Sequence, residues 1–162
     1  MKTEKDYEDL LRLFNRHKVR YCIIGAYAVA YYARPRYTKD LDVFIDPVWD
    51  NSARLVKALE EFGFKGLNLR PEDFMVKGSV VQLGYEPVRV DIVSSISGCS
   101  FGAVWKSREV GRYGKEKVFF IGLGQLIKNK RAAHRSQDRA DLELLIKVRS
   151  RSRHAGISNF KT

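Results

Sequence analysis

Residues 22–46 read CIIGAYAVAYYARPRYTKDLDVFID, and this stretch decides the fold. The apolar run that ends at Ile24 is stopped by Gly25, as expected for a strand that enters a tight turn. Small apolar residues from 26 to 32 predict a buried helix, and the proline that follows ends it because the residue before a proline avoids helical dihedrals. Residues 39–45 alternate between two faces and predict a second strand. The order is therefore strand, turn, helix, strand.

The second of these strands carries two acidic side chains on one face. Asp40 and Asp42 are two residues apart, so their carboxylates point the same way and repel each other unless a cation lies between them. Mg²⁺, or Mn²⁺, takes oxygen ligands and is held by a few carboxylates together with substrate phosphates. Asp91 lies in the alternating run 88–93, and it becomes the third ligand if that run forms a neighbouring strand. Two such cations could activate a hydroxyl group and neutralise a leaving pyrophosphate.

The turn at Gly25 supplies a complementary feature. A glycine that closes a strand lets the backbone approach a ligand closely, and the helix that starts at Ala26 points unpaired N–H groups toward it. We therefore expect a triphosphate to bind between this turn and the carboxylates. Taken alone, a glycine after a strand is usually only a turn, and an isolated Asp-x-Asp is usually solvated.

Composition narrows the class of protein. A chain of 162 residues with 44% apolar and 12% aromatic residues is long enough for one globular domain with a core. The net charge of +11 favours polyanionic partners such as nucleotides or RNA, although a basic surface can also be merely solvated. Two cysteines make no disulfide framework, and no apolar stretch suits a signal peptide or a membrane span. We expect a cytoplasmic protein with no membrane contact.

Residues 1–149 are expected to form a single domain of the α+β (mixed α/β) class, followed by a basic tail, 150–162, that frays. The expected elements, in order, are a helix over 3–18, a strand over 20–24, a helix over 26–32, a strand over 39–45, a helix over 51–63, antiparallel strands at the runs FMV, VVQLGY and VRVDIV between residues 74 and 93, a helix over 101–106, a hairpin at 113–114, and closing helices over 122–134 and 138–149.

These residues resemble those of a known superfamily. Gly25-Ala26, then Asp40-Leu41-Asp42, then Asp91 in an alternating strand look like the pattern of the nucleotidyltransferases, which have a Gly-Gly or Gly-Ser turn, an Asp-x-Asp and a third Asp. The stretch from Gly25 to Asp42 is more closely similar to small bacterial proteins related to the AbiEii toxins and to the minimal nucleotidyltransferases. The run LIKNKRAA at 126–133, with the two aspartates that follow it, is similar to their closing helices.

The resemblance implies a nucleotidyltransferase-like fold, with a small mixed sheet flanked by helices. It implies that Asp40, Asp42 and Asp91 hold Mg²⁺ and catalyse transfer of a nucleoside monophosphate from an NTP to a hydroxyl group, with release of pyrophosphate. By analogy Lys130 reaches the triphosphate.

The polar residues around this motif have two interpretations each. Arg36 and Thr38 precede the metal strand and either contact phosphates or base, or are ordinary loop residues. Asp138 and Asp141 start the last helix, where acidic residues stabilise the helix dipole and can pair with Arg131 or Arg135, so we interpret them as structural.

One departure from the superfamily pattern lies in the glycine turn, and it is compatible with weakened activity or with none. Ala26 stands where the superfamily usually has Gly or Ser, so a methyl group replaces a hydroxyl or open space near the phosphates. Loss of one hydrogen bond there would weaken nucleotide binding by about 1 kcal/mol.

Two hypotheses follow. The first is a Mg²⁺-dependent nucleotidyltransferase with RNA such as tRNA as the favoured acceptor, because the C-terminal half is rich in arginine, and with a small molecule or a protein side chain as other acceptors. The second is a degenerate nucleotidyltransferase fold that binds nucleic acid or a partner protein, for instance in a toxin–antitoxin system. A homodimer is compatible with either hypothesis.

Overall fold

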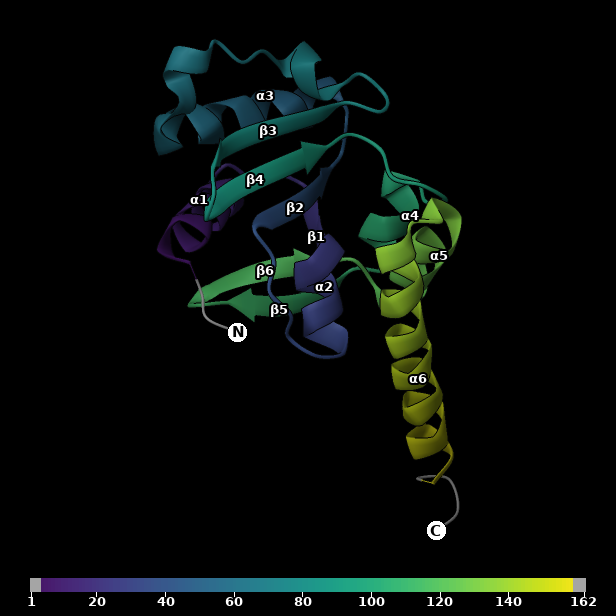
Figure 1. The fold of residues 1–162 in the computed structure, drawn as a ribbon. Helices are drawn as coiled ribbons and strands as arrows, with labels where there is room; N and C mark the ends of the chain where they lie inside the picture. The colour runs from purple at the N-terminus through teal and green to yellow at the C-terminus, as the bar shows by residue number, and fades with distance from the viewer. Residues whose placement is uncertain (1–3, 159–162) are drawn as a thin grey trace.

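The computed structural model describes residues 4–158 and consists of one six-stranded mixed sheet with helices around it (Figure 1). Its elements are α1 (Lys5–Arg16), β1 (Tyr21–Ile24), α2 (Gly25–Tyr32), β2 (Asp40–Ile45), α3 (Trp49–Leu59), η1 (Glu60–Phe64), η2 (Lys65–Leu67), η3 (Pro71–Phe74), β3 (Val80–Tyr85), β4 (Val88–Val93), α4 (Phe101–Lys106), β5 (Glu109–Tyr113), β6 (Glu116–Phe120), α5 (Leu123–Ala133) and α6 (Ser136–Ser158).

The strand order is β3-β4-β2-β1-β6-β5. The central strand pairs are mixed, since β1 runs antiparallel to β2 but parallel to β6, and β2 runs parallel to β4. The outer hairpins, β3 with β4 and β5 with β6, are antiparallel. The expected α+β class and the predicted strand, turn, helix, strand order of residues 22–46 are confirmed.

Alternation along β2 and β4 separates an apolar face from a polar one. Leu41, Val43, Val90 and Ile92 are buried in the core, and on this side Tyr7 of α1 lies beside Val90. Asp42 and Asp91 have the opposite parity, so they point to the other face of the sheet. The hydrophobic pattern therefore fixes the strand register and, with it, the side on which the carboxylates lie.

The run FMV does not form the predicted strand. Pro71 to Phe74 form a short 3₁₀ helix, and the carboxylate of Asp73 accepts a 2.8 Å hydrogen bond from the amide of Arg70 at its start. Only Phe74 is buried, and Val76 is exposed. A proline followed by two acidic residues starts a helical turn, so three apolar residues are too few to impose a strand.

The last helix is longer than the sequence predicted. α6 continues from Ser136 to Ser158, through residues 150–158 of the segment expected to fray, and the remaining residues of that segment lie outside the described part of the chain. No glycine or proline interrupts residues 137–155, which allows the helix to continue. None of the described helices is long and apolar enough to cross a membrane.

Candidate active site

The strand pairing brings the three predicted carboxylates to one region. In the parallel ladder of β2 with β4, Asp42 lies opposite Asp91, and Asp40 lies opposite Arg89. The expectation that the strand of Asp91 is adjacent to the Asp-x-Asp strand is therefore confirmed. Because paired residues on neighbouring strands share a face, the side chains of Asp42 and Asp91 enter the same space.

This space is an open cleft of 770 Å³. Its walls come from the β1–α2 turn, the polar face of β2 and β4, the loop after β4, and the C-terminal half of α5 with the start of α6. The lining residues are Ile24, Gly25, Asp42, Lys77, Val80, Asp91, Val93, Ser95, Ile96, Ser97, Gly98, Asn129, Lys130, Ala133 and Arg135. The cleft thus joins the Gly25 turn to two carboxylates and to basic side chains.

Gly25 is required at the turn for two reasons. Its φ of +64° lies in the left-handed region, and a Cβ built there would overlap the Asp42 carboxylate. No side chain caps the N-terminus of α2, so its first amide groups lie beside Asp42 without a side-chain acceptor. Ala26 differs from the expectation, since it is buried and does not line the cleft.

The environment of Asp42 opposes its ionised form. Burial, followed by the neighbouring carboxylates of Asp91 and Asp40, raises the pKa of Asp42 to about 6, although Lys130 and Arg135 act in the opposite direction. Burial also raises the pKa of Asp91, although Arg89 opposes this. A site that raises the pKa of two adjacent carboxylates favours occupation by a cation, which would restore their charge.

Arg89 is the residue that sequence reasoning missed. Its Nη2 atom donates a 2.8 Å hydrogen bond to Oδ2 of Asp40, and its Nε atom is 3.3 Å from Oδ1 of Asp91. Arg89 is two residues before Asp91 on β4 and so shares its face, which was the signal available in the sequence. The guanidinium group therefore holds Asp40 and Asp91 together.

The three carboxylates have the oxygen ligands that a hard divalent cation prefers, but their oxygen atoms are not grouped around a single point. Oδ1 of Asp40 is buried and accepts no hydrogen bond, and such a free carboxylate oxygen suits Mg²⁺. Oδ1 of Asp91 also accepts no hydrogen bond, but it is paired electrostatically with Arg89. Within residues 4–158, however, no three acidic, histidine or cysteine side chains are already grouped as a metal site. Asp42 and Asp91 share the cleft, and Asp40 would join them if it exchanged Arg89 for the cation.

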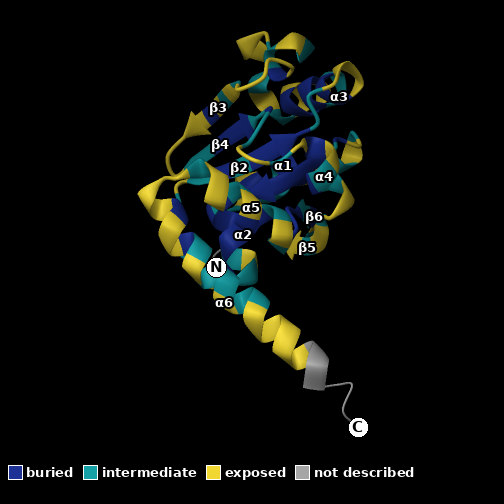
Figure 2. Ribbon diagram, turned by 90° about the vertical axis from the view of Figure 1, so that its right-hand side faces the viewer, coloured by how far each residue is buried: buried dark blue, intermediate teal, exposed yellow. Residues whose placement is uncertain are grey.

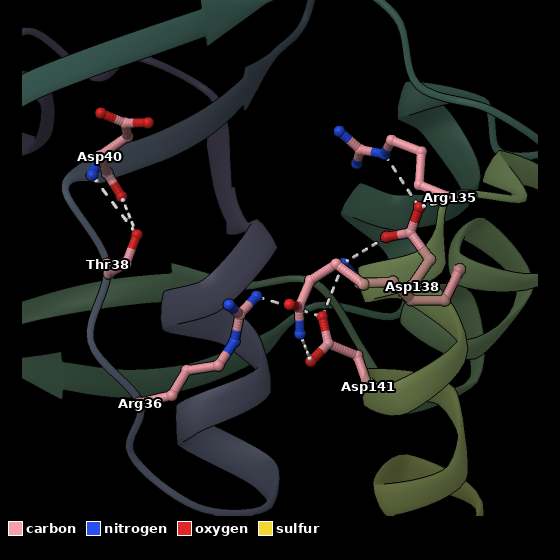
Figure 3. Close-up of polar contacts among 8 residues, drawn as sticks. Arg36, Thr38, Asp40, Arg135, Asp138 and Asp141 are labelled. Carbon is pink, nitrogen blue, oxygen red and sulfur yellow. Dashed lines mark hydrogen bonds and ion pairs between the residues drawn. The ribbon is translucent and has the colours of Figure 1, made fainter.

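A second charged cluster lies where α5 meets α6 (Figure 3). Nζ of Lys130 is 2.9 Å from Asp138 and 3.2 Å from Asp141, and all three side chains are buried. Burial raises the pKa of Asp138, but hydrogen bonds from Lys130 and Arg135 outweigh burial and lower its pKa overall. The two aspartates are structural, as expected, and Asp138 pairs with Arg135 as predicted.

Two further predicted binding residues, Arg36 and Thr38, do not line the cleft. The Nη2 atom of Arg36 donates a 3.1 Å hydrogen bond to Asp141, which ties the loop before β2 to α6 (Figure 3). Thr38 Oγ1 donates to the backbone oxygen of Asp40 and accepts from its amide. Lys130 does line the cleft, but its ammonium group is already paired with two carboxylates. Lys77, Ser95 and Asn129 were not anticipated from the sequence.

Comparisons with known proteins bear on the fold. No family model matches the sequence, and no curated protein sequence matches it. The chain is similar in structure to the lincosamide antibiotic adenylyltransferase LnuA in its lincomycin-bound crystal structure, with a TM-score of 0.57 and 19% sequence identity over 90% of this chain and 98% of that one. At this identity the similarity establishes the fold, so the chain has a nucleotidyltransferase-like fold.

Proposed function

We propose that the protein is a nucleotidyltransferase that moves a nucleoside monophosphate from an NTP to a hydroxyl acceptor. One observation carries this proposal: Asp42 and Asp91 lie opposite each other in one cleft, and Gly25 closes that cleft beside Asp42. The nucleotidyltransferase-like fold shared with LnuA, an adenylyltransferase, supports the same reaction class. We also propose that the protein belongs to the nucleotidyltransferase superfamily, among the small bacterial proteins related to the AbiEii toxins and the minimal nucleotidyltransferases.

The reaction forms one bond and breaks one. The acceptor oxygen attacks the α-phosphorus of the NTP, the bond from that phosphorus to the bridging oxygen of the β-phosphate breaks, and pyrophosphate leaves. The hydroxyl proton would pass to a nearby base, and Asp91, which lines the cleft, is the residue that we propose for this role. The amide groups at the start of α2 would bind phosphate oxygens, because a helix N-terminus favours anions.

Mg²⁺ or Mn²⁺ would be held by Asp42, Asp91 and Asp40. When bound, the cation neutralises the triphosphate and lowers the pKa of the attacking hydroxyl. The protein's own contribution is to present Asp40 Oδ1, a buried oxygen that accepts no hydrogen bond. Asp91 Oδ1 would exchange its ion pair with Arg89 for the cation.

Four further residues complete the proposed nucleotide site. Lys130 and Arg135 border the cleft and would orient the triphosphate, with Lys130 fixed by its two aspartates. Arg36 and Thr38 would act indirectly, by holding the loop that leads into β2.

RNA such as tRNA is the acceptor that we propose. The basic surface of α5 and α6 supports this choice over a small molecule or a protein hydroxyl, as argued below. A second candidate, a binding module on a degenerate fold, is favoured by one observation: Arg89 already neutralises two of the three carboxylates.

Thermal unfolding separates the two candidates. The melting temperature of the protein is measured with each NTP, with and without Mg²⁺, for the wild type and for Asp42→Ala. A nucleotidyltransferase shows an increase of several degrees that needs both NTP and Mg²⁺ and is lost in Asp42→Ala, because a ligand at about 100 times its Kd adds about 2.7 kcal/mol. No increase with any NTP, in protein that unfolds cooperatively, would contradict the enzyme and favour the binding module.

A further inference from the structure

Helix α6 extends away from the body of the protein. Its first half packs on α5, where Leu145 is buried. The second half of the helix projects below the sheet in Figure 1, and Figure 2 shows the part of it before residue 156 as mostly exposed on the side in view. Residues 147–155 of this projecting arm are exposed or half-buried. The arm therefore contributes nothing to the described core.

The projecting arm is basic on opposite sides. Lys147 and Arg151 are four residues apart and share one face, and Arg149 and Arg153 form an equivalent pair on the other side. None of these four side chains makes an ion pair with any described residue. The arm thus carries four positive charges with no negative partner in the described structure.

This arrangement is unfavourable for an isolated helix. Like charges four residues apart destabilise a helix, and the arm has two such pairs and no tertiary packing to offset them. The helix dipole favours cations only in the last turn, whereas Lys147 and Arg149 lie more than two turns before Ser158. A polyanion that supplies the missing negative charge would stabilise the arm.

The positive charge continues from the arm to the cleft. Lys128, Arg131, Arg135 and Arg139 are exposed along α5 and the start of α6, and Arg135 lines the cleft itself. Asp138 and Asp141 are buried and pair with Lys130, although Asp138 also pairs with Arg135. Glu143 is an exposed acidic residue of this stretch. A predominantly basic surface therefore leads from the cleft to Arg153.

We propose that the α6 arm binds the phosphate backbone of an RNA whose hydroxyl end lies in the cleft, an inference that rests on the proposed function. From Asp141 to Arg153 the helix is roughly 18 Å long at about 1.5 Å per residue. A small acceptor in the cleft cannot reach both ends of this surface, whereas a polynucleotide can. Paired charges on both sides of a helix suit backbone contacts rather than base recognition.

Fluorescence anisotropy of a labelled single-stranded RNA tests the proposal over a series of salt concentrations. The full-length protein is compared with the triple variant Lys147→Ala, Arg151→Ala, Arg153→Ala, whose positions are exposed and make no described contact. Each phosphate contact contributes about 0.7 to the slope of log affinity against log salt, so we expect the slope to fall by about 2 in the variant. Affinity at low salt should fall more than tenfold.

A matched control removes the same charge elsewhere. Lys5→Ala, Arg12→Ala, Arg16→Ala changes three exposed basic residues of α1, on the far side of the molecule from α6 (Figure 1). The proposal predicts a salt slope close to the wild type for this control. The proposal is overturned if both triple variants lose the same RNA affinity, or if the arm variant binds RNA as tightly as the wild type. It is also overturned if the protein binds anionic lipid vesicles and does not bind RNA.

The same variants separate this proposal from the reaction itself. The arm variant should keep the Mg²⁺-dependent stabilisation by NTP, and Asp42→Ala should lose that stabilisation but still bind RNA. If NTP and Mg²⁺ do not raise the melting temperature of the wild type, the proposed reaction is contradicted and the RNA result still stands. If the arm variant binds RNA as tightly as the wild type, only the RNA inference is contradicted.

Discussion

The guanidinium group of Arg89 lies 2.8 Å from the carboxylate of Asp40 and 3.3 Å from that of Asp91. Both carboxylates belong to the set that would bind a divalent cation. The arginine therefore acts as an internal counter-charge, and a cation must compete with it for Asp40. The free energy of this ion pair is subtracted from the affinity of the site for metal.

Replacing Arg89 should strengthen metal binding in the absence of nucleotide. Arg89→Met keeps an unbranched side chain but removes the guanidinium group and its charge, so Asp40 becomes free to turn toward the cation. We expect the affinity for Mn²⁺ to rise severalfold, because the cation no longer competes with the guanidinium group for Asp40. Titration of Mn²⁺ followed by electron paramagnetic resonance measures the change.

Lys39→Met is the control for this experiment. Lys39 is next to Asp40 in sequence but pairs with the exposed Glu86, so its removal changes the local charge without freeing a carboxylate of the site. Its Mn²⁺ affinity should change much less. Weaker Mn²⁺ binding in Arg89→Met would instead show that the arginine positions Asp91 for the metal.

Asp42 should lower the free energy of unfolding of the ligand-free protein at neutral pH. Its pKa is about 6 in the folded protein and about 4 in an unfolded chain, so the native state binds the proton more tightly. The free energy of unfolding therefore falls as the pH rises from about 4 to about 6. Asp42→Asn removes this loss and should be about 1–2 kcal/mol more stable than the wild type at pH 7, after allowance for solvent in the open cleft.

Urea unfolding at a series of pH values checks this prediction in the absence of Mg²⁺. The stability difference between wild type and Asp42→Asn should shrink toward zero near pH 4, where both side chains are neutral. If the difference in unfolding free energy between the two proteins does not vary with pH, the asparagine stabilises the protein through packing. The raised pKa of Asp42 then does not explain the gain in stability.

Gly25→Ala should damage the fold and the site together. The new methyl group would require a left-handed conformation and would displace the Asp42 carboxylate, so we expect a loss of about 2–4 kcal/mol in unfolding free energy. Gly124→Ala is the matched control, because nothing lies within 4 Å of its added Cβ on α5. Chemical denaturation should show the control to be neutral or slightly stabilised; similar losses in both variants would refute the steric explanation.

Lys130 should be essential for the packing of α5 against α6. Lys130→Met leaves Asp138 and Asp141 buried with one less positive partner, which should destabilise the protein by about 3 kcal/mol. Adding Asp138→Asn should recover part of that loss, because it removes one of the two buried negative charges that Lys130 had neutralised, although Asp138 also pairs with Arg135. A double-mutant cycle by urea unfolding measures the coupling between Lys130 and Asp138, and additive losses would contradict the ion-pair account.

The sequence was sufficient for the features that depend on local pattern. The order of elements in residues 22–46 follows from apolar residues that recur every three to four positions in a helix and every two positions in a strand. The period of two also gives the face of the strand on which Asp42 lies. Both patterns are local, so they do not depend on how the strands are paired. The adjacency of Asp91 followed from its alternating strand together with the family resemblance.

Features that depend on which elements meet could not be predicted. The pairing of Arg89 with Asp40 exists only because β4 lies parallel to β2, and the contact of Lys130 with Asp141 exists only because α6 turns back onto α5. The 3₁₀ helix at Phe74 was missed because turn chemistry at Pro71 outweighed a short apolar run.

The most direct test of the proposed reaction is transfer of a label from an NTP that is radioactive at its α-phosphate. The protein is incubated with each labelled NTP, RNA and Mg²⁺, and both labelled RNA and released pyrophosphate are measured. We predict that label enters RNA with an equal amount of pyrophosphate, and that Asp42→Asn and Asp91→Asn abolish both products while remaining folded. Mg²⁺-dependent NTP binding without transfer to RNA or release of pyrophosphate would contradict the account.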